Sequence, residues 1–130
     1  MLAYKEADGT FRSVTRQVLA DAEHGQGSSL RYFEVGVGGH TTLEHHEHTH
    51  VVIPIRGIGA ALVEDRIVPL AQHDVVFVPS WGWHQFRNTG DEPFGFLCAV
   101  TAERDRPVRP TPEQIAAFEQ DPAIAEFIRY

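Results

Sequence analysis

The sequence is poor in cysteine, in basic residues and in long apolar runs, and each shortage excludes a class of protein. A single cysteine, Cys98, rules out an intramolecular disulfide and points to a reducing compartment, where a buried cysteine acts as a small hydrophobic side chain. No apolar run approaches the length needed to cross a membrane, and the N-terminus lacks a signal-peptide pattern. We therefore predict a cytoplasmic protein with no membrane partner.

Basic residues number 11 and acidic residues 18, which gives a net charge of −7 at pH 7 with neutral histidines. A surface with this balance repels phosphate backbones, and no basic helix stands out. We therefore predict a small-molecule partner and no nucleic acid. At 130 residues the chain is long enough for one domain with its own hydrophobic core.

Short apolar and β-branched segments, separated by turn signals, follow one another as far as residue 101. No helical pattern interrupts them, which is typical of an all-β sandwich or barrel. A glycine turn is expected at 36–39, and the histidine-rich segment before Val51 is expected to be extended. The other expected strands are 13–20, 30–35, 51–55, 60–63, 66–70, 74–79, 84–88 and 94–101.

The composition changes after residue 101. Residues 103–110 are charged and contain proline, as in a linker, and Thr111-Pro112 and Asp121-Pro122 are typical helix starts. We expect the helical tail to pack on the barrel or on a second subunit. The predicted parts are a lead-in with the first strand (1–29), a barrel core (30–101) and a linker with C-terminal helices (102–130).

Histidine is concentrated in one stretch, since five of the eight histidines lie between Gly38 and Gly57. Within it, Glu44, His46, His48 and His50 occupy every second position. On an extended strand this spacing places all four side chains on one face. Imidazole nitrogens and carboxylate oxygens are typical ligands of a transition metal ion, so this stretch predicts a metal site.

Two spaced motifs make the chain resemble the cupin superfamily, whose members are double-stranded β-helix (jelly-roll) barrels that hold one metal ion. The first motif is Gly, five residues, His, one residue, His, three or four residues, Glu, six residues, Gly. It fits the stretch from Gly38 to Gly57 without a gap. The second motif runs Gly, five residues, Pro, one residue, Gly, two residues, His, three residues, Asn.

The second motif keeps Pro79, His84 and Asn88 in register, and it departs at His73 and Trp81, where the family has glycine. The resemblance covers about residues 30–101. It implies an all-β, double-stranded β-helix (jelly-roll or cupin barrel), to which this chain adds a short C-terminal helical tail.

Carried over position by position, the resemblance implies the ligands Glu44, His46, His50 and His84. The first ligand position holds Glu44 and the carboxylate position holds His50, so the family's three histidines and one carboxylate are kept with two of them exchanged. His48 is an alternative ligand, because it would form a His-x-His pair with His46. In that register the third ligand position falls on an apolar residue, which favours the first set.

Three histidines and one carboxylate suit one divalent iron, manganese, nickel or zinc ion. The run from Pro79 to His84 is similar to the corresponding stretch of ring-cleaving cupin dioxygenases. The resemblance therefore implies a metal-dependent dioxygenase acting on a small aromatic or dicarbonyl substrate. The residues expected to line its pocket are Trp81, Trp83, Gln85, Phe86 and Tyr32, with Gln85 or Tyr32 as hydrogen-bond partners for the substrate.

Two other functions stay open. The site also suits a non-redox lyase or isomerase, in which Glu47 or His48 carries the proton, or a binding module without turnover. The alternation after His50 places Val51, Ile53 and Ile55 on the face opposite the ligands. An apolar outer face of this kind predicts a homodimer.

Overall fold

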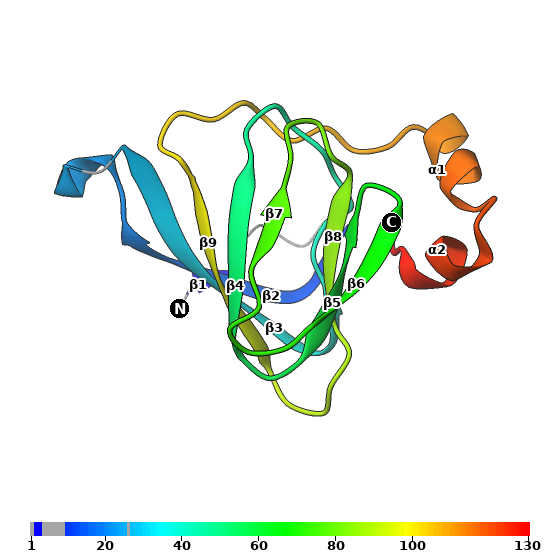
Figure 1. Cartoon of the computed structure of the whole chain (residues 1–130), viewed down its shortest axis with the longest axis horizontal. Helices are drawn as coiled ribbons and strands as arrows, with labels where there is room; N and C mark the ends of the chain where they lie inside the picture. The colour runs from blue at the N-terminus through cyan, green and yellow to red at the C-terminus, as the bar shows by residue number, and fades with distance from the viewer. Residues whose placement is uncertain (1, 4–9, 26) are drawn as a thin grey trace.

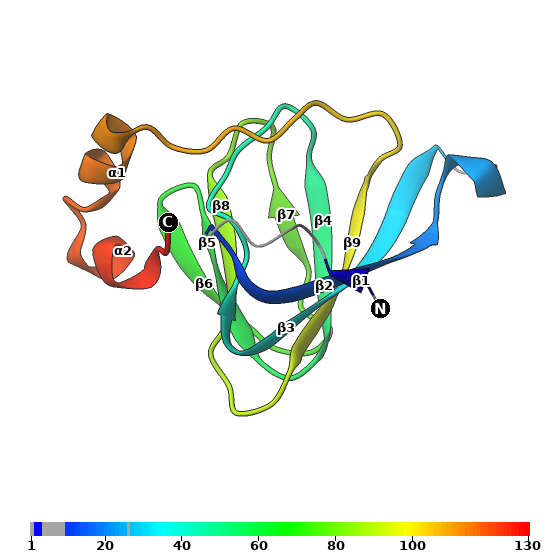
Figure 2. The same ribbon diagram turned by 180° about the vertical axis from the view of Figure 1, so that it is seen from behind.

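A computed structural model describes residues 2–3, 10–25 and 27–130. The strands form one curled antiparallel sheet that makes an all-β barrel, and two helices follow (Figures 1 and 2). The strands are β1 (Leu2–Ala3), β2 (Arg12–Ala20), β3 (Ser28–His40), β4 (His50–Arg56), β5 (Gly59–Val63), β6 (Arg66–Leu70), β7 (Val76–Val78), β8 (His84–Asn88) and β9 (Phe94–Thr101). A 3-10 turn covers Ala22–His24, and the helices are α1 (Pro112–Phe118) and α2 (Pro122–Phe127).

The strand order β6-β5-β8-β3-β9-β4-β7 places β3 at the centre of the sheet. Outside this order, β2 also pairs with β3. Two strands, β3 and β9, separate β8 from β4 in this order. The sheet nevertheless curls far enough to bring His84 of β8 and His50 of β4 together, with ring centroids 5.0 Å apart. The two halves of the sequence motif therefore meet inside one end of the barrel.

The glycine segment 36–39 does not end a strand as expected, because β3 continues through it to His40. The register between β2 and β3 shifts there, since Arg12 pairs with His40 and Val14 with Val35. Gly38 adopts φ 74°, which is costly for other residues. The glycines thus form a β-bulge, a device that bends a strand without breaking the sheet.

Two hydrophobic clusters hold the fold together. The first fills the barrel and contains mainly phenylalanine and valine side chains from all the long strands. The second joins Leu62 and Ala60 of β5 to Ile115 of α1 and to Ile124 and Phe127 of α2. The helical tail therefore packs on the outside of the barrel, which confirms that expectation.

Both helix starts have the predicted caps. The Thr111 side chain accepts the N–H of Gln114 while the Gln114 side chain accepts the N–H of Thr111, and Asp121 caps α2. Both helices are short. No helix among the described residues is long and apolar enough to span a membrane.

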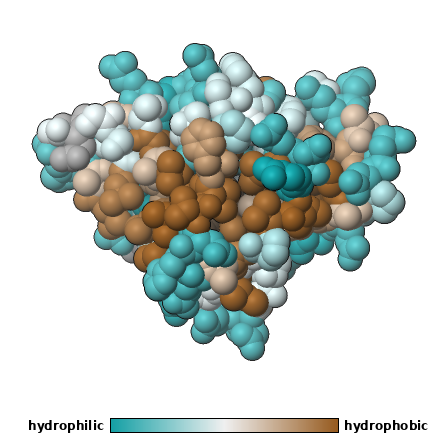
Figure 3. Space-filling model, in the orientation of Figure 1, coloured by the Kyte–Doolittle hydropathy of each residue, from teal (hydrophilic) through white to brown (hydrophobic). Residues whose placement is uncertain are grey.

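The outer face of β9, β4 and β7 is strongly apolar, and Figure 3 shows it as a broad hydrophobic area in the orientation of Figure 1. Val51 pairs with Phe77 on one side and with Ala99 on the other, and Ile53 pairs with Leu97. Phe77 is 57% exposed and Val51 38% exposed. We call these five residues the apolar sheet face.

We propose that a second copy of the chain covers the apolar sheet face in a homodimer. Because a two-fold interface brings the same surface together twice, one added charge appears twice in it. We expect the wild type to have the mass of a dimer in analytical ultracentrifugation, and Phe77→Asp to have the mass of a monomer. The matched control is Val75→Asp, since Val75 is also exposed, at 66%, but lies just before β7. A monomeric wild type would contradict the proposal.

Candidate metal centre

The histidine-rich segment is not the expected continuous strand, because β3 ends at His40 and β4 begins at His50. Between them the chain forms isolated bridges, of Glu44 with His84 of β8 and of His45 with Val108. The Asp105 carboxylate accepts the backbone N–H groups of Glu47 (2.7 Å) and His48 (3.0 Å) and bends the segment there. The idea that one strand face carries all four side chains is therefore wrong. The loop still wraps around the barrel end and directs several of them inward.

Two overlapping groups of possible ligand atoms result. Atoms of Glu44, His46 and His84 lie within 4.8 Å of one another, and so do ring nitrogens of His46, His48 and His50. The Nε2 atoms of His46 and His50 are 2.9 Å apart. The structure therefore brings together the four residues implied by the motif, with His46 common to both groups and His48 beside it.

The other ring nitrogen of each histidine is already occupied. Nδ1–H of His46 donates to the carbonyl of His48 (2.7 Å), and Nδ1–H of His84 donates to that of Gly82 (2.9 Å). Nδ1 of His50 lies 3.1 Å from Sγ of Cys98. These contacts fix the ring orientations and direct Nε2 of each ring away from them, as is usual for metal-binding histidines.

The imidazoles are also neutral, the form that binds metal. Burial lowers the pKa of His46 to about 4 and that of His84 to about 3, and it lowers the pKa of His50 as well. Because Nδ1–H of His46 donates to a carbonyl, its Nε2 carries the lone pair, and Nε2 of His50 lies 2.9 Å from it. The site thus gathers buried, neutral imidazole nitrogens and the Glu44 carboxylate within a few ångströms. The donor set therefore fits a transition metal ion.

His48 differs from the other histidines in its partner. Its Nδ1–H donates to the Asp105 carboxylate at 2.7 Å, and its ring stacks on that of His46 with centroids 3.6 Å apart. Hydrogen bonds from the backbone of Glu47, and then from His48, hold the pKa of Asp105 below its usual value. His48 is thus a buried side chain fixed beside the ligands, and its role as an alternative ligand stays a prediction.

Four of the five expected pocket residues lie elsewhere. Tyr32 is on the outer face of β3, where its hydroxyl donates to Glu34 (2.9 Å). Gln85 points away from His84 along β8, and its amide bonds to the carbonyl of Thr41 (2.8 Å) and to the backbone of Arg129. Because neighbouring strand residues face opposite sides, Gln85 could not share the face of His84. Neither residue reaches the cavity.

Trp81 and Trp83 are also outside the cavity. The Trp83 ring stacks on His45 with centroids 3.7 Å apart and contacts Phe118 of α1 edge-on. Trp81 meets His45 edge-on and is half exposed. The tryptophans therefore help to seat α1 on the barrel. Phe86 alone of the five lines the space beside His84.

Two residues that face the metal centre were missed by sequence reasoning. Cys98 was expected only as a buried hydrophobic side chain, and it is buried, but its Sγ contacts both His50 and the guanidinium of Arg31, 3.5 Å away. Arg31 is only 6% exposed. The alternation of apolar residues along their strands indicates that both side chains face inward. Their place beside the candidate metal ligands follows from the pairing of Arg31 on β3 with Cys98 on β9, which the sequence alone does not give.

The candidate metal centre opens into a cavity of about 520 Å³. A charged segment, residues 102–111, runs over this end of the barrel between β9 and α1 (Figure 1), and we call it the strap. Asp105 and a two-way backbone pairing of Val108 with His45 (2.8 and 3.0 Å) attach the strap. The cavity is lined by Thr10, Arg16, Arg31, Thr42, Glu44, His46, His48, His50, Arg104, Asp105, Arg106, Pro107 and Arg109.

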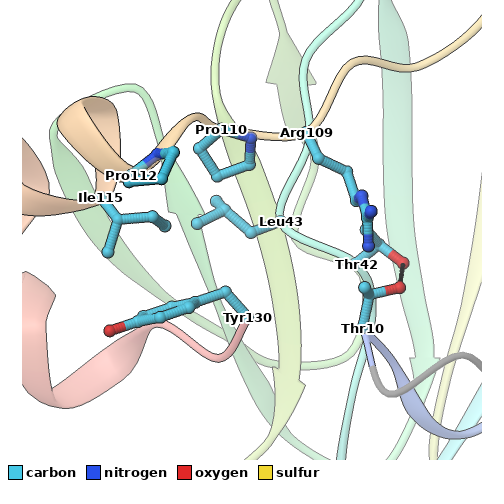
Figure 4. A pocket seen from close by; sticks show the side chains of 8 residues that line it. All are labelled: Thr10, Thr42, Leu43, Arg109, Pro110, Pro112, Ile115 and Tyr130. Atoms are coloured by element: carbon cyan, nitrogen blue, oxygen red, sulfur yellow. Dashed lines mark hydrogen bonds between the residues drawn. The ribbon is translucent and has the colours of Figure 1, made fainter.

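A second, more apolar cleft of about 640 Å³ adjoins the cavity (Figure 4). Leu43, Pro110, Ile115 and Tyr130 form its apolar walls. Thr10, Thr42 and Arg109 line both spaces. A ligand at the metal centre can therefore extend along the strap toward α1.

A barrel with buried histidines and a carboxylate gathered inside one end, under a strap, defines a small β-barrel protein with a candidate metal centre. The Cupin domain family matches residues 31–100, more than half of the chain, so the chain belongs to the cupin family. This confirms the resemblance and the fold class.

Relatives of high similarity cover nearly the whole chain. The 1-methylthio-D-xylulose 5-phosphate methylsulfurylase of Rhodospirillum rubrum is 50% identical over 98% of this chain and 82% of its own length. A cupin-2 domain structure from Rhodospirillum rubrum is 52% identical, with a TM-score of 0.91 over 97% of this chain and 84% of that chain. A cupin 2 conserved barrel domain protein from Rhodopseudomonas palustris is 47% identical, with a TM-score of 0.90 over 97% and 86%.

Proposed function

We propose that the chain is a metal-dependent enzyme that removes the methylthio group from a phosphorylated 2-ketose. The observation that carries this proposal is the 50% identity with the Rhodospirillum rubrum methylsulfurylase over nearly the whole chain. The name of that protein gives 1-methylthio-D-xylulose 5-phosphate as the compound it acts on. The proposal assigns the same substrate to this chain.

The cavity supports this choice of substrate. Glu44, His46, His50 and His84 would hold a divalent metal ion, which would act as a Lewis acid on the ketone next to the C–S bond. Arginine side chains in the same cavity suit the phosphate. The space of about 520 Å³ is of the size usual for small-molecule sites.

The Cys98 thiol is the group placed to accept the methylthio group. Its sulfur bonds to the methylthio sulfur as the bond from C1 to that sulfur breaks, and the electron pair goes to C1 as an enolate of the ketone. C1 gains a proton, balancing the one that Cys98 loses, and the product is a 1-deoxyketose phosphate. A small thiol then exchanges with the methyl disulfide on Cys98 and leaves as a mixed disulfide.

Two neighbours favour this role of Cys98. Burial raises the pKa of its thiol overall, and the adjacent positive charge of Arg31 offsets part of that rise. Nδ1–H of His50 is within hydrogen-bond distance of the sulfur, at 3.1 Å. Positive charge and an N–H donor beside a cysteine both stabilise the thiolate that reacts.

The proposal is tested by incubating metal-loaded protein with 1-methylthio-D-xylulose 5-phosphate and dithiothreitol under argon. We expect phosphorus NMR to show its conversion to 1-deoxy-D-xylulose 5-phosphate, and D-xylulose 5-phosphate, which lacks the methylthio group, to stay unchanged. Absence of turnover with iron, manganese, nickel and zinc alike would contradict the proposal.

The dioxygenase remains a second candidate, because the inner cavity beside His84 is walled by Phe33, Phe86 and Phe96 and would admit an apolar molecule such as dioxygen. An oxygen electrode separates the two functions. The C–S cleavage consumes no oxygen and proceeds under argon, whereas a dioxygenase consumes one O₂ for each substrate.

A further inference from the structure

We propose that the cavity contains a phosphate-binding subsite, formed by Arg31 of β3 with Arg104, Arg106 and Arg109 of the strap. The identity of the phosphate, the 5-phosphate of a ketose, rests on the proposed function. The subsite itself rests on the burial, charge and placement of these side chains.

Arg31 is the strongest observation. Its side chain is 94% buried, yet its Nε–H has no hydrogen-bond partner among the described residues. One of its terminal N–H groups donates to a weak acceptor, Sγ of Cys98 at 3.5 Å, and its guanidinium carbon lies 5.0 Å from the Phe33 ring centroid. A buried guanidinium with an unused N–H is costly unless an anion accepts it. Arg31 lines both the outer and the inner cavity, so its free N–H is available to a bound ligand.

The charge of the cavity wall is opposite to that of the whole chain. Five arginines and two carboxylates line the cavity, a formal charge of +3 with neutral histidines, although the chain as a whole carries −7. The five are nearly half of the 11 basic residues. Such a concentration inside a cleft attracts a small anion and leaves the outer surface acidic.

The backbone of the strap is anchored beside its arginines. Arg104 and Arg106 flank Asp105, whose carboxylate is fixed by the backbone of Glu47 and His48. Arg109 follows Val108, which pairs with His45. Figure 4 shows Arg109 reaching from the strap toward Thr42 and Thr10, where the cavity meets the apolar cleft.

The arrangement favours a phosphate monoester over other anions. Planar guanidinium groups bind phosphate oxygens in pairs, and arginines reach this cavity from both β3 and the strap. The cavity of about 520 Å³ is lined on one side by the strap and suits a phosphate on a small molecule. A phosphate held here lies next to the candidate metal ligands, since both line one cavity.

Calorimetric titration of metal-loaded protein with inorganic phosphate at low ionic strength tests the subsite. Arg106 and Arg109 are exposed, so Arg106→Gln/Arg109→Gln should fold normally. We expect this double variant to bind phosphate at least about ten-fold more weakly than the wild type, and Arg31→Gln to lose more. The control, Arg66→Gln, removes an exposed charge on β6 outside the cavity and should leave the affinity unchanged. Should Arg31→Gln fail to fold, the strap double variant decides alone.

Equal phosphate affinity in the strap double variant and in Arg66→Gln would overturn the subsite, as would binding that depends on the metal but not on the arginines. Turnover of the methylthio ketose phosphate is measured separately on the wild type. If the wild type turns over the substrate but the arginine variants bind phosphate as tightly as the wild type does, the proposed function stands and the subsite is wrong. If the variants bind phosphate more weakly but the wild type shows no turnover, the subsite stands and the proposed function is wrong.

Discussion

Replacing His46 or His84 by alanine is expected to lower metal affinity by at least about 100-fold and to abolish turnover. Loss of a hydrogen-bond partner of a metal ligand already costs 10- to 100-fold in affinity, so loss of the ligand itself should cost more. His46 belongs to both groups of ligand atoms, and His84 is held by Gly82 with its Nε2 free. Elemental analysis of protein purified without added metal, together with a metal titration, measures the effect.

His73→Asn is the matched control, because His73 is an exposed histidine between β6 and β7 and belongs to none of the groups of possible ligand atoms found among the described residues. Its φ of 73° is one that asparagine adopts more readily than alanine. It should keep the metal content of the wild type. Far-ultraviolet circular dichroism shows whether His46→Ala and His84→Ala remain folded. Folded variants with wild-type metal content would contradict the candidate site.

The competition between Glu44 and His48 is settled by the same measurement. Glu44→Gln and His48→Gln are compared side by side, since both side chains lie beside His46. Because His48 is already bonded to Asp105, we expect the loss of Glu44 to lower metal affinity more. The reverse order would make His48 the ligand.

The spacing of the motifs predicted which residues meet in the site, but the local strand structure predicted for them was wrong. Glu44, His46, His50 and His84 meet in space although the histidine-rich segment between β3 and β4 is not one continuous strand. The prediction failed locally because Asp105, nearly sixty residues away, bends the loop by accepting its backbone N–H groups. A contact between residues so far apart in the sequence cannot be predicted from the local pattern of apolar and polar residues.

The strands were predictable because alternating apolar residues and turn signals depend on neighbours in sequence. The residues that line the pocket were not predictable, because they depend on which strands are neighbours in the sheet. The tryptophans next to His84 were expected to line the pocket, but Trp83 packs against Phe118 of helix α1 instead. Arg31 and Cys98, in contrast, come together only through the pairing of β3 with β9.

Cys98→Ser is expected to lower turnover of the methylthio ketose phosphate on the order of 1,000-fold or more while leaving the metal in place. A serine hydroxyl is a far weaker nucleophile than a thiol at neutral pH, and removing a nucleophile costs at least this much in other enzymes. The hydroxyl can still accept the Nδ1–H of His50, so the orientation of that ring is kept. A purely structural Cys98 would tolerate the substitution with little change in turnover.

The single-turnover adduct distinguishes a nucleophile from a residue that only positions His50. Wild-type protein mixed with substrate in the absence of any other thiol should gain one methylthio group, which mass spectrometry of the Cys98 peptide detects and dithiothreitol removes. Cys98→Ser should gain none, and His73→Asn should gain as much as the wild type. Because Cys98 is the chain's only cysteine, no other side chain can form the disulfide. A Cys98→Ser protein that turns over at the wild-type rate would show that the methylthio group leaves without a covalent protein intermediate.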